Sequence, residues 1–155
     1  MTGTRSVARA LNEFPAGERL VASLERSISR TRTAAAHLAK VRVLVIMGRE
    51  PLVVAGSGTF VDELVRVAGG VNVVQSRRPW PVYPLERAVA DDPEVVVDAA
   101  VNEHGRSLGP LTAIPAVKYG KLRLLPNDDI LRPGPRLSQA LVELFRAIHP
   151  GLEPP

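Results

Sequence analysis

Residues 41–47 read Val-Arg-Val-Leu-Val-Ile-Met, a nearly continuous run of β-branched and aliphatic side chains. Such a run is typical of a strand that is buried on both faces, as the strands of parallel sheets are. A second run of this kind is Glu94-Val-Val-Val-Asp98. Asp98 is therefore expected at the carboxyl end of a buried strand, where α/β proteins often place their ligands.

Helical patterns alternate with the strands. The spacing of apolar residues predicts helices over 59–68, 85–90 and 134–148, and short strands over 71–74 and 121–125. This alternation predicts an α/β fold, a single Rossmann-like lobe with a mainly parallel sheet of about four or five strands flanked by helices.

A long helical arm is expected before the first strand. Residues 16–39 carry apolar side chains at spacings of three and four, and Pro15 separates this helix from a shorter one over residues 5–12. We therefore expect a helical arm over 1–40, an α/β lobe over 41–150 and a tail over 151–155.

The apolar stripe of the arm contains Leu20, Leu24, Ile28 and Leu38. A lone lobe covers only part of a helix of this length, and soluble monomers rarely expose a large apolar stripe. We therefore expect a homodimer in which two arms cover each other. The competing outcome is an arm that folds back wholly onto its own lobe.

Composition excludes several classes of protein. The chain has 155 residues, 45% of them hydrophobic and 23% charged, as globular domains do. It has no cysteine, and its three histidines lie far apart, so no metal site and no cofactor is expected. Its 20 basic residues outnumber 16 acidic ones, but they are scattered along the chain, and we expect no binding to nucleic acid.

No catalytic motif is present. The segment Gly56-Ser-Gly58 lacks the third glycine of a dinucleotide fingerprint, because that position is Val61. No serine lies in a nucleophile elbow, and no histidine has an evident partner. The sequence therefore predicts a tight turn at residues 56–58 and a protein that is not an enzyme.

Two loops are candidates for ligand contact. Arg77-Arg-Pro-Trp-Pro81 places the only tryptophan between two prolines, which restrict the backbone and present the ring. The alternative is a Trp80 ring folded over the domain's own core. In the loop that follows the last predicted strand, Asp128 and Arg132 either pair with each other or face a ligand.

Four segments, in order, resemble one protein family. They are the helix that leads into Ala68-Gly-Gly-Val-Asn-Val73, then Pro79-Trp-Pro81, then Leu85-Glu86 with Asp92-Pro-Glu-Val-Val-Val97, and finally Arg132-Pro-Gly-Pro-Arg136 with Ile148-His-Pro150. Together they resemble the C-terminal lobe of the helical-backbone periplasmic binding proteins, which serve ABC importers of cobalamin, ferric siderophores and haem.

The resemblance implies a non-catalytic solute-binding lobe that binds a corrinoid or an iron chelate and docks on an ABC permease. Trp80 matches an aromatic residue that packs on the ligand, and Asp128 and Arg132 match polar residues of the cleft. Val53 stands where the cobalamin-binding members have another cleft aromatic. Glu86 matches the surface acid that docks on an arginine of the permease.

The family has two lobes, and the resemblance covers one of them. An alternative function is therefore a derived single-lobe protein that acts as an oligomeric interaction module without a transport role. The resemblance implies a periplasmic or membrane-associated location outside the cytoplasm. Residues 1–14 show no signal-peptide pattern, so a cytoplasmic location is expected if the chain is complete.

Overall fold

The computed structural model describes residues 14–131 and 134–155, with side chains from Leu20 onward. The helix predicted over residues 5–12 and the side chain of Arg132 lie outside this range. The helices are α2 (Phe14–Ala35), α3 (Phe60–Val67), α4 (Leu85–Ala90), α5 (Pro115–Lys118) and α6 (Leu137–Ile148). The strands are β1 (Val41–Arg49), β2 (Leu52–Val54), β3 (Gly70–Asn72), β4 (Val95–Asp98) and β5 (Leu122–Leu124), and three short 3-10 helices are η1 (Val101–Glu103), η2 (Gly109–Ala113) and η3 (Asp129–Leu131).

The strands form one sheet in the order β2-β1-β4-β5, and β3 also pairs with β1. β1 is parallel to β3 and β4, β4 is parallel to β5, and β2 returns antiparallel to β1. β4 pairs along one edge of β1. Both β2 and β3 therefore pair along its other edge. The predicted mainly parallel α/β lobe is confirmed. The sequence did not indicate β2, because Leu52–Val54 lies between Pro51 and the Gly56-Ser-Gly58 turn, a segment interpreted as a loop.

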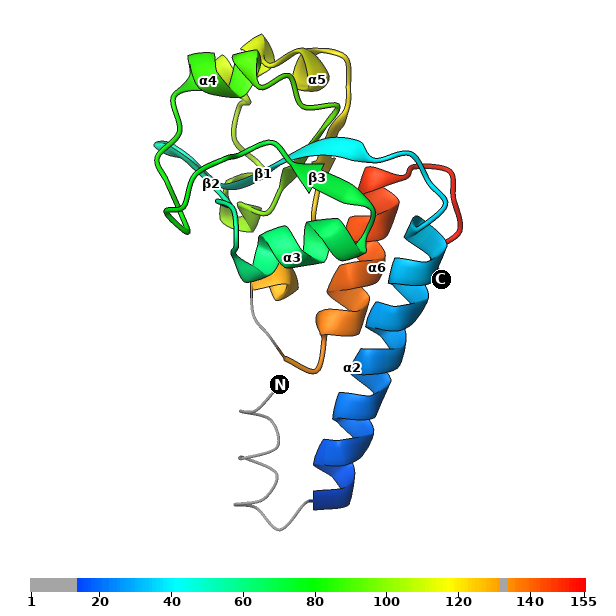
Figure 1. Cartoon of the computed structure of the whole chain (residues 1–155). Coiled ribbons are helices and arrows are strands. Elements are labelled where there is room, and N and C mark those ends of the chain that lie inside the picture. Colours follow the sequence, from blue (N-terminus) through cyan, green and yellow to red (C-terminus); the bar gives the residue numbers. More distant parts are fainter. Residues whose placement is uncertain (1–13, 132–133) are drawn as a thin grey trace.

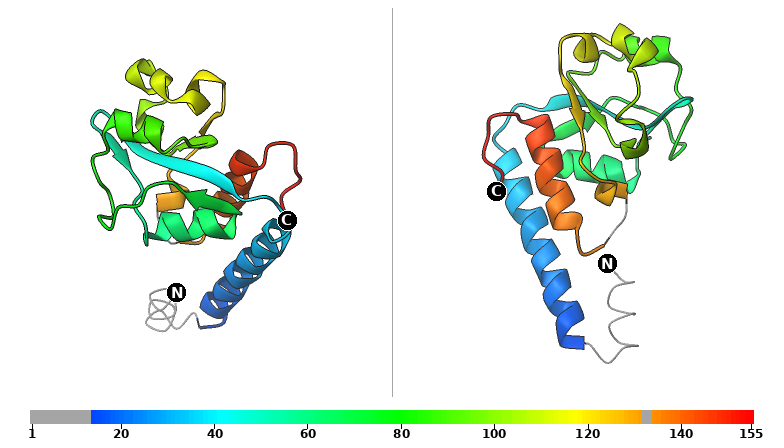
Figure 2. Two further views of the ribbon diagram at one scale, coloured as in Figure 1. Left: turned by 45° about the horizontal axis from the view of Figure 1, so that its top comes forward. Right: turned by 180° about the vertical axis from the view of Figure 1, so that it is seen from behind.

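Side-chain alternation along β1 and β4 divides the core into two layers. One face packs against α3 and α6, and the other packs against α4 and α5 (Figures 1 and 2). The first layer contains Val43, Val45, Val95 and Val97, and the second contains Leu44, Ile46 and Val96. Both faces of the two central strands are therefore buried, as their continuous apolar runs predict.

α2 runs beside α6 and forms the long arm of the molecule (Figure 1). Leu24 is buried in the core layer that contains α3 and α6, and Leu20, Ile28 and Leu38 pack against that layer. The stripe on which the expected dimer depended is therefore covered at Leu24 and partly covered at Leu20, Ile28 and Leu38. The homodimer stays a prediction, but an exposed stripe at these positions is no longer an argument for it.

A pair of glycines brings α3 close to α6. Gly69 has a φ of 87°, and a Cβ placed there would lie 2.8 Å from His149 Nε2. A Cβ at Gly70 would lie 2.7 Å from Val65 Cγ1. His149 Nε2 donates a hydrogen bond to the carbonyl oxygen of Ala68 at 3.0 Å, so its ring joins the ends of the two helices.

This contact predicts a pH-dependent stability. Burial lowers the pKa of His149 below its ordinary value near 6.5, although the hydrogen bond to Ala68 opposes the shift. Below about pH 6.5 the unfolded chain then binds more protons than the folded chain, so stability is lost as the pH falls. We expect a lower urea midpoint near about pH 5.5 than near about pH 7.5. His149→Gln should flatten the dependence of the urea midpoint on pH. His37→Gln, at an exposed position, should leave this dependence unchanged. The same pH dependence in both variants would contradict the role of His149.

Candidate functional site

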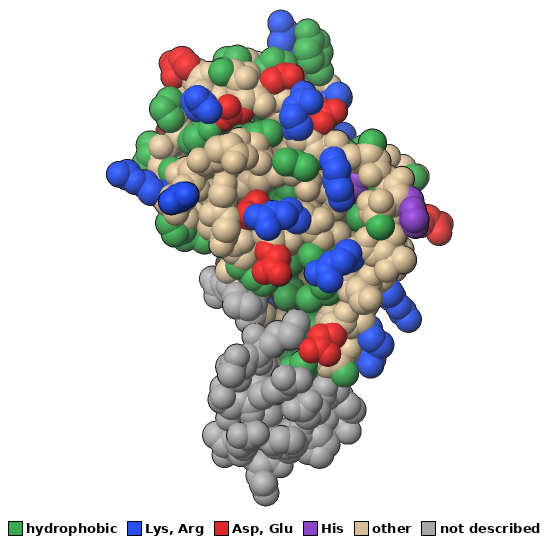
Figure 3. All heavy atoms as spheres, in the orientation of Figure 1, with side chains coloured by type: hydrophobic (Ala, Val, Ile, Leu, Met, Phe, Trp, Pro, Cys, Tyr) green, Lys and Arg blue, Asp and Glu red, His purple; other side chains and the backbone are tan. Residues whose placement is uncertain are grey.

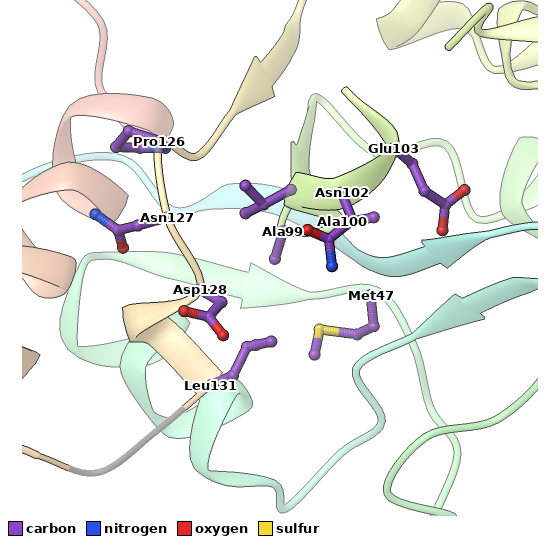
Figure 4. Close-up of a pocket in the computed structure, with 10 residues that line it drawn as sticks. Met47, Ala99, Ala100, Asn102, Glu103, Pro126, Asn127, Asp128 and Leu131 are labelled. Carbon is purple, nitrogen blue, oxygen red and sulfur yellow. The ribbon is translucent and has the colours of Figure 1, made fainter. Parts of the chain in front are cut away.

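A cavity of about 430 Å³ lies at the carboxyl ends of β1, β4 and β5 (Figure 4). This is the edge where α/β sheets commonly bind ligands. It is lined by Met47, Ala99, Ala100, Val101, Asn102, Glu103, Pro126, Asn127, Asp128 and Leu131. The predicted ligand residue Asp128 is therefore part of a cavity wall.

Side chains from several elements point into this hollow. Among them are Met47 from β1, Asn102 from η1 and Asp128 from the segment that follows β5 (Figure 4). Glu103 points instead toward the end of β1, where its Oε1 accepts a hydrogen bond from the Arg49 backbone N–H at 3.3 Å. The hollow thus presents a thioether, an amide and a carboxylate, which suit a ligand with both apolar surface and hydrogen-bonding groups.

A buried ion pair supports the wall of the cavity. Arg49 Nη2 lies 2.6 Å from Asp98 Oδ2, and both side chains are almost wholly inaccessible to solvent. Arg49 Nη1 also donates to the carbonyl oxygens of Glu103 at 2.9 Å and Arg106 at 3.2 Å. The pair therefore ties the loop after β4 to the end of β1. Asp98, a candidate because it ends a strand, has a structural partner in Arg49.

The loop that carries Trp80 is hydrogen-bonded to β2 and the residues after it, on the edge of β1 opposite β4. Val54 N–H donates to Pro81 O at 3.2 Å and Gly56 N–H to Pro79 O at 2.9 Å. A Cβ at Gly56 would lie 2.1 Å from the carbonyl oxygen of Arg78, so this close approach requires glycine. The Trp80 side chain is 48% exposed and is therefore presented at the surface rather than folded into the core.

The sheet register relates the Trp80 loop to the cavity. Val82 forms an antiparallel bridge with Val53, and Val53 pairs with Gly48 of β1. Cross-strand partners project to the same face of a sheet, and so do residues two apart along a strand. Val82 and Val53 therefore share one face with Gly48, and a Cβ at Gly48 would lie 3.9 Å from Oε1 of Glu103 in the cavity wall. Trp80 and Val53 do not line the cavity itself.

Glu86 lies elsewhere, at an exposed position in the first turn of α4. Two contacts to Asp91 hold this short helix: the Tyr83 hydroxyl donates to its carboxylate, and Arg87 Nε lies 3.0 Å from its Oδ1. Burial, together with the hydrogen bond to Asp91, raises the pKa of Tyr83 above its ordinary value. α4 covers the face of the sheet opposite α3 and α6, so Glu86 belongs to a surface separate from the cavity.

Several cavity residues were not candidates from the sequence. Met47 was interpreted only as part of a buried strand, and Asn102 and Glu103 only as part of a loop or short helix over residues 100–110. Their position directly after parallel strands is the signal that could have indicated them, because those strand ends meet at one edge. Nothing local to Arg49 indicates its partner, since Asp98 lies on a different strand.

Among the residues that the structure describes, no group of three or more His, Cys, Asp or Glu side chains is arranged to hold a metal ion. None of the helices in this part of the chain has the length and apolarity to span a membrane. On the face shown in Figure 3, lysine and arginine side chains are spread among acidic and apolar ones.

Comparison with known proteins identifies the family. Residues 3–128 match the sequence model of a family described as periplasmic binding protein, and the chain belongs to this family. The vitamin B12-binding protein of Salmonella typhimurium is 30% identical over 115 residues, which are 71% of this chain and 41% of that protein. The vitamin B12-binding protein of Vibrio parahaemolyticus is 26% identical over 108 residues, 68% of this chain and 39% of that protein. The chain thus spans about two fifths of the length of these two relatives.

Solved structures agree on the fold. The periplasmic heme-binding protein RhuT from Roseiflexus sp. RS-1 matches with a TM-score of 0.78 and 28% identity over 94% of this chain and 60% of that one. The vitamin B12-binding protein BtuF of Vibrio cholerae has a TM-score of 0.74 and 20% identity over 90% of this chain and 57% of that one. The predicted resemblance to periplasmic binding proteins is confirmed, and the relatives are named as binding proteins rather than enzymes.

Proposed function

We propose that the chain is a non-catalytic solute-binding lobe of an ABC-type importer and that it takes a corrinoid or an iron chelate. The observation that carries this proposal is the cavity at the carboxyl ends of β1, β4 and β5, with Asp128 in its wall. The names of the relatives, which refer to vitamin B12 and heme, support the ligand class. By the same proposal the lobe works in the periplasm or at the outer face of the cytoplasmic membrane.

The proposed ligand site combines an apolar wall with polar groups. Trp80 and Val53 supply the wall, and Trp80 is the larger contributor because its exposed ring can stack on a flat ligand. Asp128 and Arg132 supply an acceptor and a donor, and Arg132 lies outside the described residues. The family resemblance implies a second lobe on the opposite side of the ligand. That lobe would close the site and increase the buried area of the ligand.

Docking on the permease is a separate part of the proposal. Glu86 is exposed on α4, away from the cavity, and can accept the bidentate hydrogen bonds of an arginine. A surface acid in this position leaves the ligand site free while the lobe is bound to a membrane partner. Ligand binding and permease binding would then depend on different residues of the same lobe.

A ligand titration tests the proposed site. Cyanocobalamin, dicyanocobinamide, hemin and ferrichrome are titrated by calorimetry, and the fluorescence of Trp80, the only tryptophan, is followed in parallel. We expect at least one probe to bind and to quench this fluorescence. Stacking contributes about 0.5–1.5 kcal/mol beyond area burial, so Trp80→Ala should weaken binding by about 2- to 12-fold or more.

Glu86→Ala is the matched control for this titration, because Glu86 is exposed and lies on a separate surface. It should leave the affinity for the soluble probes unchanged. Absence of binding by all four probes would contradict the proposed function. Equal affinities for wild type and Trp80→Ala would contradict the role of the ring while leaving the function in place.

The homodimer through the helical arm is a further proposal, and with it the alternative role as an oligomeric interaction module. Its support is the length of α2, which spans 22 residues. Light scattering at low micromolar concentration tests it. A mass near 16.7 kDa would exclude the dimer, and about twice that mass would support it.

A further inference from the structure

A second cavity, of about 200 Å³, borders the core layer that contains α4 and α5. The first cavity borders the other layer, because its residues Met47, Ala99 and Leu131 belong to or pack against the layer of α3 and α6. None of the residues that line the second cavity belongs to the proposed ligand site. The second cavity is therefore separate from that site and has no role in the proposed function.

Four leucines form the interior of the second cavity. Leu111 of η2 is buried, and Leu52 of β2, Leu85 of α4 and Leu108 before η2 are half-buried around it. Sites for small molecules have this composition, a mostly apolar lining with few polar groups. A water molecule occupies about 30 Å³ in the liquid, so the cavity has the volume of about six or seven waters. A ligand with a similar number of non-hydrogen atoms would fill it.

Arg49 also lines this cavity, and one nitrogen of its buried guanidinium lacks an acceptor. Nε donates to Asp98 Oδ2 at 2.8 Å, and Nη1 donates to the carbonyl oxygens of Glu103 and Arg106. Nη2 lies 2.6 Å from Asp98 Oδ2, but it makes no well-aligned hydrogen bond within the part of the chain that the structure describes. A buried donor without an acceptor costs free energy, so an acceptor from outside the chain would stabilise it.

The charges around the second cavity select a neutral acceptor. Asp98 already balances the charge of Arg49, and Glu50, an exposed residue of the lining, would repel a further anion. A bound water would need two to four polar partners. Ser107, the other polar residue of the lining, is exposed like Glu50, so the guanidinium is the one buried polar side chain among the lining residues that the structure describes. A ligand that covers the leucines and accepts one hydrogen bond fits this lining better than water does.

We propose that the second cavity is a ligand site for a small neutral molecule with an apolar body and one hydrogen-bond acceptor, such as a ketone, an ester or an ether. Nη2 of Arg49 donates to the acceptor, and the four leucines enclose the apolar body. This inference goes beyond the proposed function and does not depend on it, because the two cavities border different layers of the core.

The test titrates the full chain with three probes and follows the backbone amides by ¹H–¹⁵N NMR. Cyclohexanone carries the acceptor, methylenecyclohexane has the same shape without it, and cyclohexanecarboxylate is an anion. We expect cyclohexanone to shift the amide signals of Ser107, Leu108 and Leu111, which line the second cavity, and to leave those of Asn127 and Asp128 in the first cavity unchanged. Cyclohexanecarboxylate should bind more weakly than cyclohexanone, because Asp98 already balances Arg49.

Two variants test the parts of the site. Arg49→Met with Asp98→Leu removes the donor together with its counter-charge, and apolar replacements of a buried ion pair often keep a protein folded. In this variant the affinity for cyclohexanone relative to methylenecyclohexane should fall by about tenfold or more. Leu108→Trp places a larger side chain in the cavity and should abolish binding of both neutral probes. Leu152→Trp, the same change at an exposed position of the tail, should leave binding unchanged.

Several results would overturn the inference. If neither neutral probe shifts the amides of the second cavity, or if the shifts occur only at Asn127 and Asp128, the second cavity is not a ligand site. Equal binding by Leu108→Trp and wild type would overturn it as well, and this comparison decides if the double variant does not fold. An unchanged relative affinity in a folded double variant, or tighter binding of the anion than of cyclohexanone, would overturn the assignment to a neutral acceptor on Arg49. Each result leaves the proposed function in place, because that function is tested with other probes at the first cavity.

Discussion

Replacement of Arg49 by methionine is expected to lower the free energy of unfolding by about 3–5 kcal/mol. The side chain of Arg49 is 4% exposed and that of Asp98 is not exposed at all, so the substitution leaves a buried carboxylate without its cation. Asp98 would keep the hydrogen bond from the Ala100 N–H, at 2.9 Å, to its other oxygen, and His104 Nε2 lies 3.6 Å from that same oxygen. The measurement is urea unfolding near neutral pH, followed by circular dichroism.

The double variant Arg49→Met with Asp98→Leu is the control for this prediction. It removes both charges, and well-packed apolar replacements of a buried ion pair are often neutral or stabilising. We therefore expect the double variant to recover much of the stability lost in Arg49→Met. A loss below about 1 kcal/mol in the single variant, or equal losses in both, would show that burial of an unpaired charge is not the cause.

Replacement of Phe145 by alanine is expected to cost about 3–5 kcal/mol. Phe145 is 1% exposed and is the largest fully buried side chain among the described residues. It lies on α6, which packs against α2, α3 and β4, and its ring centroid is 5.0 Å from that of His149. Truncation therefore opens a cavity in the core layer that contains α3 and α6, and the neighbouring helices can refill only part of it.

Leu152→Ala is the matched control, because Leu152 is an apolar residue of the tail that is 46% exposed. Its unfolding free energy should stay within about 0.5 kcal/mol of wild type. Phe145→Leu should fall between Phe145→Ala and wild type, because it leaves a smaller cavity. If Phe145→Ala and Leu152→Ala cost the same, α6 would not be the centre of packing between the arm and the lobe.

The central strands were predictable because their sequence pattern is local. β1 and β4 are buried on both faces, so almost every residue in them is apolar, and the predicted boundaries differ from the observed ones by about two residues at most. α4 was predicted with its observed bounds, from Leu85 to Ala90. β2 and α5 were not predicted as elements, because β2 lies in a segment punctuated by Pro51 and Gly56 and α5 has only four residues.

The candidate site was predictable only in part. Asp128 was indicated by its position after the last strand, and the structure places it in the cavity wall. Trp80 was indicated by its flanking prolines, and it is exposed, but only the bridge between Val82 and Val53 connects its loop to β2 and so to the strand that bears Met47. The contribution of Met47 was not visible, because the register shift of β1 against β2 between Ile46 and Gly48 is a property of paired strands.

The sequence by itself determined the α/β class, the order of the main elements and the family, because these depend on apolar periodicity and on motifs within short segments. Only the tertiary structure decided how the stripe of α2 is covered, that Asp98 is paired with Arg49, and that the ends of β1, β4 and β5 enclose one cavity. Each of these depends on contacts between residues far apart in the chain. Such contacts are set by the packing of complete elements against one another, and no local pattern of residues records them.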